Sequence, residues 1–163
     1  MEKLFKLLSD AQASLFVLFH KTWVYHWNVV GEDFQQLHTL FGGQYETMFE
    51  EIDRLSEHMR YLNVKPLSKL KRVLEVSGIA EGNSSVNAEG MISDLLKSNI
   101  QFCDMMSKIS EEAETQKSYA TANLVQDLME SHGKFVWMLR SFSDKPTQKV
   151  DEQIEVIEET VEE

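Results

Sequence analysis

Residues 34–62 read FQQLHTLFGGQYETMFEEIDRLSEHMRYL, a stretch without proline in which apolar residues recur every three or four positions. This spacing predicts an amphipathic helix of about eight turns with one apolar stripe facing a core. Asp33 precedes the stripe as a helix N-cap, with Gln36 at the capping-box position. The helix is expected to end between Asn63 and Pro66, since proline cannot continue it.

Three further segments carry the same periodicity, and they span residues 4–29, 91–109 and 120–142. A weaker apolar pattern over residues 67–74 predicts a small helix within the long connection between the second and third long helices. Four long helices with one long crossover predict an all-α, ferritin-like four-helix bundle over residues 1–145. Residues 146–163 form an acidic tail, which is either a short docked helix or a solvated end.

The composition narrows the classes of function. A net charge of −11 disfavours a nucleic-acid surface and favours cationic ligands. Cys103 is the single cysteine, so neither a disulfide framework nor a thiolate metal cluster is expected. The N-terminus starts an amphipathic pattern at once, without the apolar run of a signal peptide or a membrane span. These features predict a cytoplasmic protein that does not contact membranes.

Four residues of metal-ligand type flank and follow the Gly31 turn: His26, His38, Asp53 and Glu57. Imidazole and carboxylate suit divalent iron, manganese or zinc. An antiparallel hairpin brings the two histidines side by side, and Asp53 and Glu57 share one helix face. Two structural alternatives stay open, namely histidines that pack beside Trp27 or Tyr45 and a solvated acidic pair.

The spacing of these residues has a geometric consequence. His38 and Asp53 are fifteen positions apart on one helix, which is about 22 Å at 1.5 Å per residue and far beyond coordination distance. Two chains related by a two-fold axis can bring the histidines of one opposite the carboxylates of the other. No Glu-x-x-His motif occurs in the sequence, which disfavours a metal site inside one bundle.

A family resemblance covers nearly the whole chain. The pattern His26-Trp27-Asn28-Val29, Gly31, Phe34, Leu37-His38, Asp53, Glu57 and Leu62 to Pro66 resembles the Dps mini-ferritins, the DNA-protection proteins of starved cells. Residues 134–141 are similar to the last helix of that family. The resemblance implies a cytoplasmic homo-dodecameric shell that oxidises ferrous iron, preferentially with hydrogen peroxide rather than oxygen, and stores ferric mineral. It further implies that this ferroxidase activity protects against oxidative stress.

The resemblance also implies roles for single residues. His26 and His38 would bind metal from one chain, and Asp53 and Glu57 from its partner, as ligands of the catalytic centre. Trp27, beside the site, would intercept radicals or simply pack in the core.

One position departs from the family pattern. Where the family usually carries another carboxylate, four residues after the second histidine, this chain has Gly42, followed by Gly43. Glu46, one turn further on, is a candidate replacement that would bind the metal through water. The departure keeps two alternatives open: a centre that holds zinc or manganese instead of iron, and a metal-sequestering or structural cage without efficient turnover.

The charged surface gives further expectations. Only Lys3 and Lys6 lie near the N-terminus and the C-terminus is acidic, so DNA binding is not expected. Acidic residues near the predicted turn between the last two long helices are candidates for an iron pore, namely Glu111, Glu112, Glu114, Asp127 and Glu130. Glu46, Glu50 and Glu51 are candidates for mineral nucleation. An unrelated alternative is a signalling bundle with an exposed phosphotransfer histidine, His58 or His132.

Overall fold

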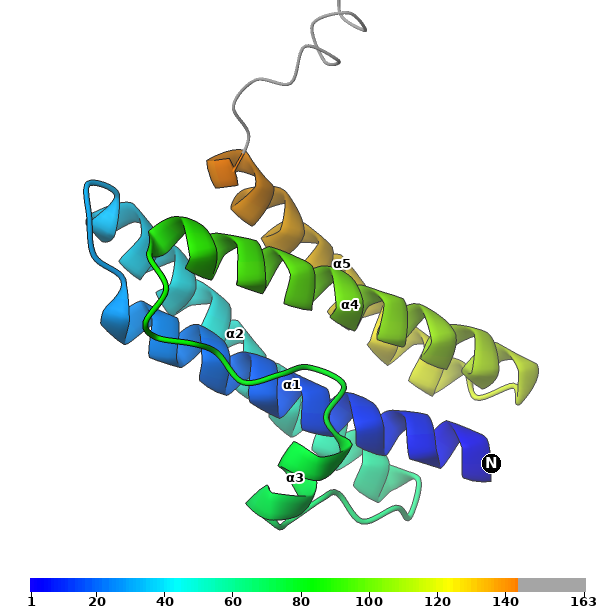
Figure 1. Ribbon diagram of the computed structural model, residues 1–163. Helices are drawn as coiled ribbons and strands as arrows, with labels where there is room; N and C mark the ends of the chain where they lie inside the picture. The colour runs from blue at the N-terminus through cyan, green and yellow to red at the C-terminus, as the bar shows by residue number, and fades with distance from the viewer. Residues whose placement is uncertain (144–163) are drawn as a thin grey trace, which may run out of the picture.

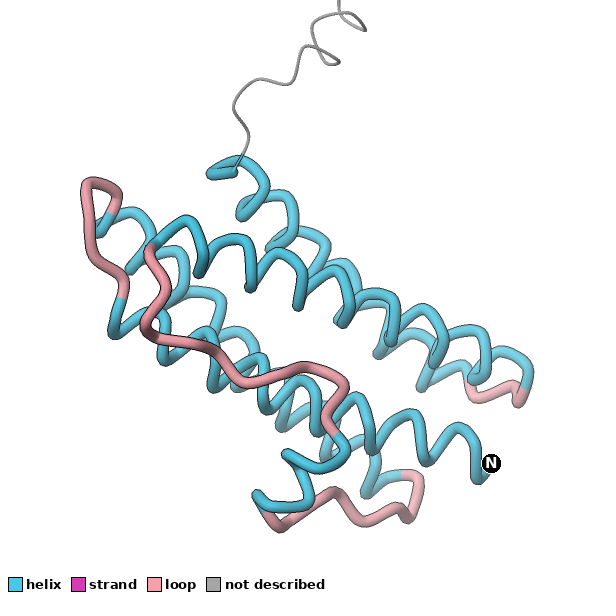
Figure 2. The backbone as a smooth tube through the Cα atoms, viewed as in Figure 1, coloured by secondary structure: helices cyan, strands magenta, loops and turns pink. Residues whose placement is uncertain are grey.

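The computed structural model describes residues 1–143, which form five helices and no strand. They are α1 (Glu2–Asn28), α2 (Phe34–Tyr61), α3 (Leu70–Val76), α4 (Ala88–Thr115) and α5 (Tyr119–Ser143). The four long helices pack as a bundle, with α3 outside it in the long crossover from α2 to α4 (Figures 1 and 2). The predicted all-α bundle with an extra crossover helix is confirmed. The predicted tail, residues 146–163, lies outside the described residues.

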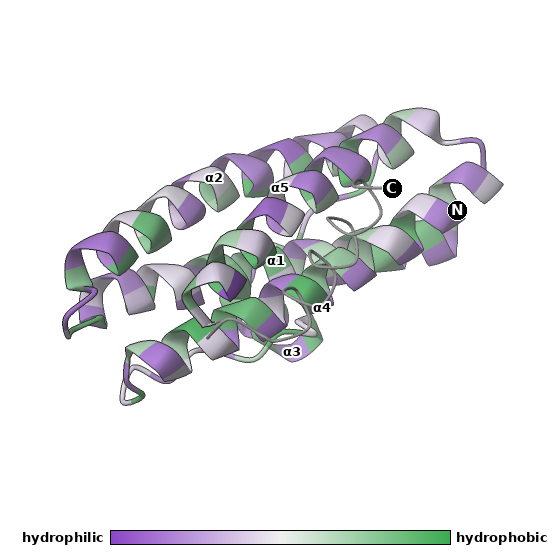
Figure 3. Ribbon diagram, turned by 90° about the horizontal axis from the view of Figure 1, so that it is seen from above, coloured by the Kyte–Doolittle hydropathy of each residue, from purple (hydrophilic) through white to green (hydrophobic). Residues whose placement is uncertain are grey.

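The core forms because each long helix turns one apolar stripe inward. Figure 3 shows hydrophobic residues recurring between hydrophilic ones along every helix. Fully buried side chains come from all four, among them Leu15, Met48, Phe102 and Leu139. Burial of each such side chain contributes roughly 1.5–3 kcal/mol to folding.

Two details of the predicted second helix are wrong. Asp33 does precede α2, but its backbone is not extended, and its side chain makes no capping hydrogen bond. The predicted capping box is therefore absent. Phe34 and Phe49 belong to the apolar stripe, yet they are 42% and 65% exposed. The apolar stripe of α2 therefore includes residues that the core of one chain does not bury.

The crossover is fastened to α1 by side chains of that helix. Gln12 Oε1 accepts a hydrogen bond from the backbone amide of Leu67 (2.8 Å), and Ser14 Oγ accepts one from that of Gly78 (2.9 Å). The Tyr25 hydroxyl accepts a third from the amide of Asn83 (3.0 Å). These contacts satisfy backbone groups that have no helical partner, so the crossover follows α1 along its length.

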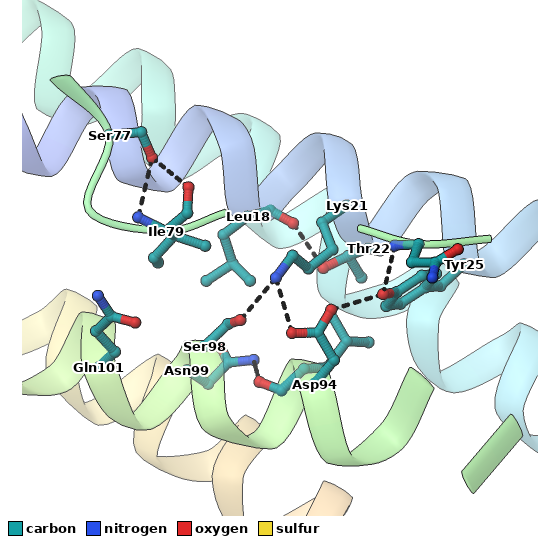
Figure 4. Close-up of polar contacts among 12 residues, drawn as sticks. Leu18, Lys21, Thr22, Tyr25, Ser77, Ile79, Asp94, Ser98, Asn99 and Gln101 are labelled. Carbon is teal, nitrogen blue, oxygen red and sulfur yellow. Dashed lines mark hydrogen bonds and ion pairs between the residues drawn. The ribbon is translucent and has the colours of Figure 1, made fainter. Parts of the chain in front are cut away.

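A buried polar network joins α1 to α4 (Figure 4). Lys21 is 2% exposed, and its Nζ donates to Asp94 Oδ1 (2.9 Å) and to Ser98 Oγ (3.0 Å). The Tyr25 hydroxyl donates to the other oxygen of Asp94 (2.6 Å). A Cβ at Gly82 would lie 2.9 Å from Lys21 Cγ, so the crossover can pass this network only with glycine there. The network fixes the last turns of α1.

The Tyr25 hydroxyl predicts a pH dependence of stability. Burial, together with the hydrogen bond to Asp94, raises the pKa of Tyr25 to about 12 from 10.0. The folded state therefore holds this proton more tightly than the unfolded state does. The resulting stabilisation is complete below pH 10 and is lost as the pH rises toward 12. Urea unfolding between pH 9 and 12 should show a smaller alkaline loss in Tyr25→Phe than in the native chain. An identical slope in both proteins would contradict this assignment.

Candidate metal centre

The turn between α1 and α2 brings His26 and His38 into contact. Their imidazole rings stack with centroids 3.7 Å apart and an interplanar angle of 19°. His26 lies in the last turn of α1 and His38 early in α2, and Gly31 takes a φ of +119° in the turn between them. A positive φ costs glycine little, which explains glycine at this position. The juxtaposition predicted from the hairpin is confirmed.

The hydrogen bonds of the two rings are reciprocal. His26 Nδ1 lies 2.7 Å from the backbone oxygen of His38, and His38 Nδ1 lies 2.9 Å from that of His26. A carbonyl oxygen only accepts, so each Nδ1 must carry a proton and donate it. In the neutral ring, the lone pair then sits on Nε2. Neither Nε2 has a protein partner among residues 1–143, so the hairpin presents two nitrogens of fixed tautomer that could bind a metal ion.

The backbone explains half of this arrangement. The oxygen of His26 is one of the last four carbonyls of α1, which have no partner within their own helix. His38 supplies the missing donor. The same hydrogen bond therefore caps α1 and orients a candidate ligand, so the ring of His38 is held without any metal.

Gly42 lies directly against the ring of His26. A Cβ built at this position would be 3.3 Å from His26 Cε1 and 3.4 Å from Nδ1. A side chain at position 42 would thus begin beside the imidazole. The absent family carboxylate would have belonged next to the two histidines. Gly43, in contrast, has no atom within 4 Å of an added Cβ.

The two candidate carboxylates lie elsewhere on α2. Asp53 and Glu57 are both exposed, one turn apart, toward the other end of the helix from His38. No group of three or more histidine, cysteine, aspartate or glutamate side chains comes together anywhere in the described chain. Glu46 is exposed as well, in a shallow groove with Phe19, Trp23 and Tyr45. One chain therefore assembles the histidines and leaves the carboxylates apart from them.

Aromatic side chains extend from the histidines along α1 and α2. The rings of Tyr45 and His26 meet edge to face, with centroids 5.2 Å apart. The ring centroid of Trp23 lies 5.9 Å from that of Tyr45 and 4.6 Å from that of Trp27. Trp27 is 54% exposed, so packing in the core of this chain does not explain it.

A second polar cluster lies inside the bundle and was missed as a unit by sequence reasoning. His132, fully buried on α5, faces Glu51 Oε2 with Nε2 (3.0 Å) and Asn99 Oδ1 with Nδ1 (2.7 Å). Asn99 donates its own amide to the backbone oxygen of Leu95 (2.8 Å), so its oxygen faces the ring as an acceptor. The buried Glu51 is therefore engaged and cannot nucleate mineral as predicted.

The phosphotransfer alternative also fails on geometry. His132 has no exposed surface, and His58 is half-buried with its Nε2 2.8 Å from Thr121 Oγ1. Burial lowers the pKa of His58, which favours its neutral, structural form. Neither residue is the exposed histidine that the alternative requires.

The candidate pore residues differ in their surroundings. Glu112 binds Lys3, and Asp127 pairs with Arg54 (N–O distance 3.1 Å). The other three are exposed carboxylates, namely Glu111, Glu114 and Glu130. Their role as an iron path stays a prediction.

Comparisons with known proteins decide the family. The ferritin family profile, described as a ferritin-like domain, matches residues 5–148. The DNA protection during starvation protein 2 of Bacillus anthracis is 30% identical over 86% of this chain and 97% of its own length. The chain belongs to the Dps mini-ferritins.

Solved structures agree with this assignment. The Dps of Thermosynechococcus elongatus superposes with a TM-score of 0.86 at 26% identity, over 90% of this chain and 94% of that one. The Dps protein of Vibrio cholerae O1, described as a member of a broad superfamily of ferritin-like diiron-carboxylate proteins, gives 0.84 at 26% identity, over 88% and 90%. This mini-ferritin thus belongs to a superfamily of iron-binding bundles. Within residues 1–143, no helix is long and apolar enough to cross a membrane.

Proposed function

We propose that this mini-ferritin binds ferrous iron between two subunits, oxidises it, and stores the ferric product inside a cytoplasmic homo-dodecameric cage. The observation that supports this most is the pair of Nε2 atoms left open by the reciprocal hydrogen bonds of His26 and His38. In each centre, these nitrogens come from one subunit, and Asp53 and Glu57 come from its partner. An antiparallel pair of α2 helices around a two-fold axis creates two such centres.

Exposed apolar side chains on α1 and α2 support the same contact. Trp27, Phe34 and Phe49 are 54%, 42% and 65% exposed in one chain. Large aromatic side chains left in water by a monomer mark a surface that a partner covers. A second copy seated here buries these rings and supplies the carboxylates.

The chemistry follows from the ligand types. Imidazole and carboxylate bind ferrous iron, and the added negative charge of the carboxylates stabilises the ferric product. Two ferrous ions supply the two electrons that reduce one hydrogen peroxide to two waters. Oxidation at a protein site in this way consumes both reactants of hydroxyl-radical formation, which is the protective function that we propose. Molecular oxygen serves as the slower oxidant.

The charge of the assembly favours iron over DNA. Twelve copies of a chain with net charge −11 sum to roughly −130, which attracts cations and repels a phosphate backbone. We expect no shift of plasmid DNA in a gel at physiological salt. Retarded DNA would contradict this expectation.

Two measurements test the proposal. Light scattering after size exclusion should give about 227 kDa, twelve times the 18.9 kDa of one chain. Ferrous iron added with hydrogen peroxide to the metal-free assembly should produce ferric absorbance faster than in buffer alone, and faster than with oxygen. A monomer, or a rate equal to that of buffer, would overturn it.

A cage that sequesters metal without efficient turnover is the second candidate, and Gly42 favours it. With glycine beside His26, each centre lacks the carboxylate that family members usually place there. Zinc, which imidazole suits, would then compete better with iron for the two histidines, and manganese stays the other candidate metal. Glu46 stays a proposed ligand through water. Saturable iron binding with an oxidation rate no higher than that in buffer would favour this second candidate.

Gly42→Asp should raise the rate of iron oxidation by about tenfold, because a further carboxylate beside the histidines adds a ligand with a negative charge. Gly42→Ala is the matched control, since its Cβ meets the His26 ring at the same 3.3 Å without adding a ligand. The initial rate of ferric absorbance with peroxide measures both variants. A gain in Gly42→Ala equal to that in Gly42→Asp would rule out the ligand explanation.

A further inference from the structure

A groove of about 410 Å³ lies between α2 and α5, and none of the candidate metal ligands lines it. Gln44 and Thr47 line it from α2, and Ser131, Lys134 and Phe135 from α5. Lys134 is the one charged lining residue, and none of the lining residues is a carboxylate. The net charge of the chain is −11, so this groove, with a cation and no acid, has the opposite sign to the chain as a whole. Such a groove can accept an anion that the rest of the surface repels.

Gln44 is the unusual residue of this groove. Its side chain is 1% exposed, and neither its amide oxygen nor its amide nitrogen has a hydrogen-bond partner in the described chain. Buried amides are almost always hydrogen-bonded, because an amide that loses its water molecules without gaining another partner destabilises the folded state. The side chain has three rotatable bonds, and a rotation that turns the amide toward the groove would let a ligand satisfy both atoms. A matching ligand must offer both an acceptor and a donor.

The other polar groups define the ligand further. Lys134 Nζ and the Ser131 hydroxyl are donors, and Lys134 has no ion-pair partner among residues 1–143. Thr47 Oγ1 already donates to the backbone oxygen of Gly43 (2.9 Å), so it can only accept a hydrogen bond from a ligand. An added Cβ at Gly43 would meet nothing within 4 Å, so glycine leaves the wall of the groove open. The groove therefore combines one positive charge with both donors and acceptors.

We propose that this groove binds hydrogen phosphate. At neutral pH this anion keeps one proton, so it has P–O oxygens that accept from Lys134, Ser131 and Gln44 Nε2, and a P–OH that donates to Gln44 Oε1. Sulfate has the same shape and charge but no proton, so it would leave the Gln44 oxygen unsatisfied. The site thus distinguishes phosphate from sulfate by one hydrogen bond. It does not depend on the function proposed above for the metal centre.

Calorimetric titration of the intact, metal-free assembly with inorganic phosphate tests this site. A chelator in the buffer removes ferric iron, which would bind phosphate by itself. We expect saturable binding of one phosphate per subunit and about tenfold weaker binding of sulfate at equal ionic strength, a ratio typical of one lost hydrogen bond to a charged ligand. Absence of saturable phosphate binding, or equal affinity for both anions, would overturn the proposal.

Variants assign the effect to the groove. Gln44→Met keeps an unbranched side chain and should bring the phosphate to sulfate ratio to about one, whereas Gln35→Met, an exposed position on α2, should leave it at about ten. Lys134→Gln should weaken the binding of both anions about tenfold. Lys97→Gln makes the same charge change on the exposed surface of α4 and should leave the binding of both anions unchanged. Thermal unfolding without anion checks that each variant folds. An unchanged ratio in Gln44→Met would overturn the role of the amide.

Discussion

A chain carrying His26→Ala and His38→Ala should regain about a quarter of the native iron-oxidation rate when it is assembled with a chain carrying Asp53→Ala and Glu57→Ala. Each double variant alone should be inactive, because every centre in its assembly lacks either both nitrogens or both carboxylates. In a mixed pair, one of the two centres is built entirely from intact groups. Random pairing makes half of the pairs mixed, which gives a quarter of all centres.

The loss in the single assemblies should be large. Mutation of groups that only hydrogen-bond to a metal ligand already lowers metal affinity or activity by roughly 10–100-fold. Removal of two ligands should therefore lower the rate of iron oxidation by about a hundredfold or more. The initial rate of ferric absorbance with peroxide is the readout, after co-expression and purification through two different tags. Cages assembled separately and mixed without exchange are the control and should stay inactive. If co-assembled cages also stay inactive, the centre does not join two chains.

The periodicity of the sequence predicted the helices well, because a repeat of 3.6 residues decides which side chains can face one core. It could not separate residues buried in the core of one chain from the exposed residues that we propose a partner covers. Phe34 and Phe49 follow the same stripe as Met48, yet they are exposed in a single chain while Met48 is fully buried. A surface covered by another subunit and a core covered by another helix have the same apolar pattern. Only the structure of the chain tells them apart.

The histidine pair was predictable and its hydrogen bonding was not. A hairpin with the Gly31 turn must place His26 near His38, because both lie a similar distance from the turn. Which backbone carbonyl accepts a hydrogen bond from each ring depends on where α1 ends and where α2 begins. Boundaries of one or two residues lie beyond what sequence patterns resolve. The open Nε2 atoms therefore follow from the structure alone.

The prediction that Glu51 nucleates mineral was wrong because its charge was taken as a sign of exposure. Gln44 and Glu51 lie seven residues apart and both fall on the stripe that contains Phe41, Met48 and Leu55. Their position in the repeat was therefore a usable signal. A charged residue in such a position requires a buried partner.

Glu51→Leu should lower the free energy of unfolding by about 1–3 kcal/mol, the cost of leaving a buried polar group without its hydrogen-bond partner. Glu51 Oε2 and His132 Nε2 are hydrogen-bonded at 3.0 Å, and the side chains are 4% and 0% exposed. His132 Nδ1 already donates to Asn99, so Glu51 is the only described partner of Nε2. Leucine would leave that nitrogen unsatisfied in an apolar interior. Glu50→Leu, one residue earlier and exposed, should change stability by less than about 0.5 kcal/mol.

Urea unfolding at one fixed protein concentration measures these changes, since assembly makes stability depend on concentration. His132→Leu should cost a similar amount, and the double variant should cost clearly less than the sum, because it removes both halves of the pair together. Additive losses would show that the two side chains do not depend on each other. Iron oxidation per folded assembly should stay native in Glu51→Leu, since a carboxylate enclosed in the bundle meets neither iron nor mineral. A loss of iron uptake at unchanged folding would instead return Glu51 to the path of the metal and make the buried pair more than a structural element.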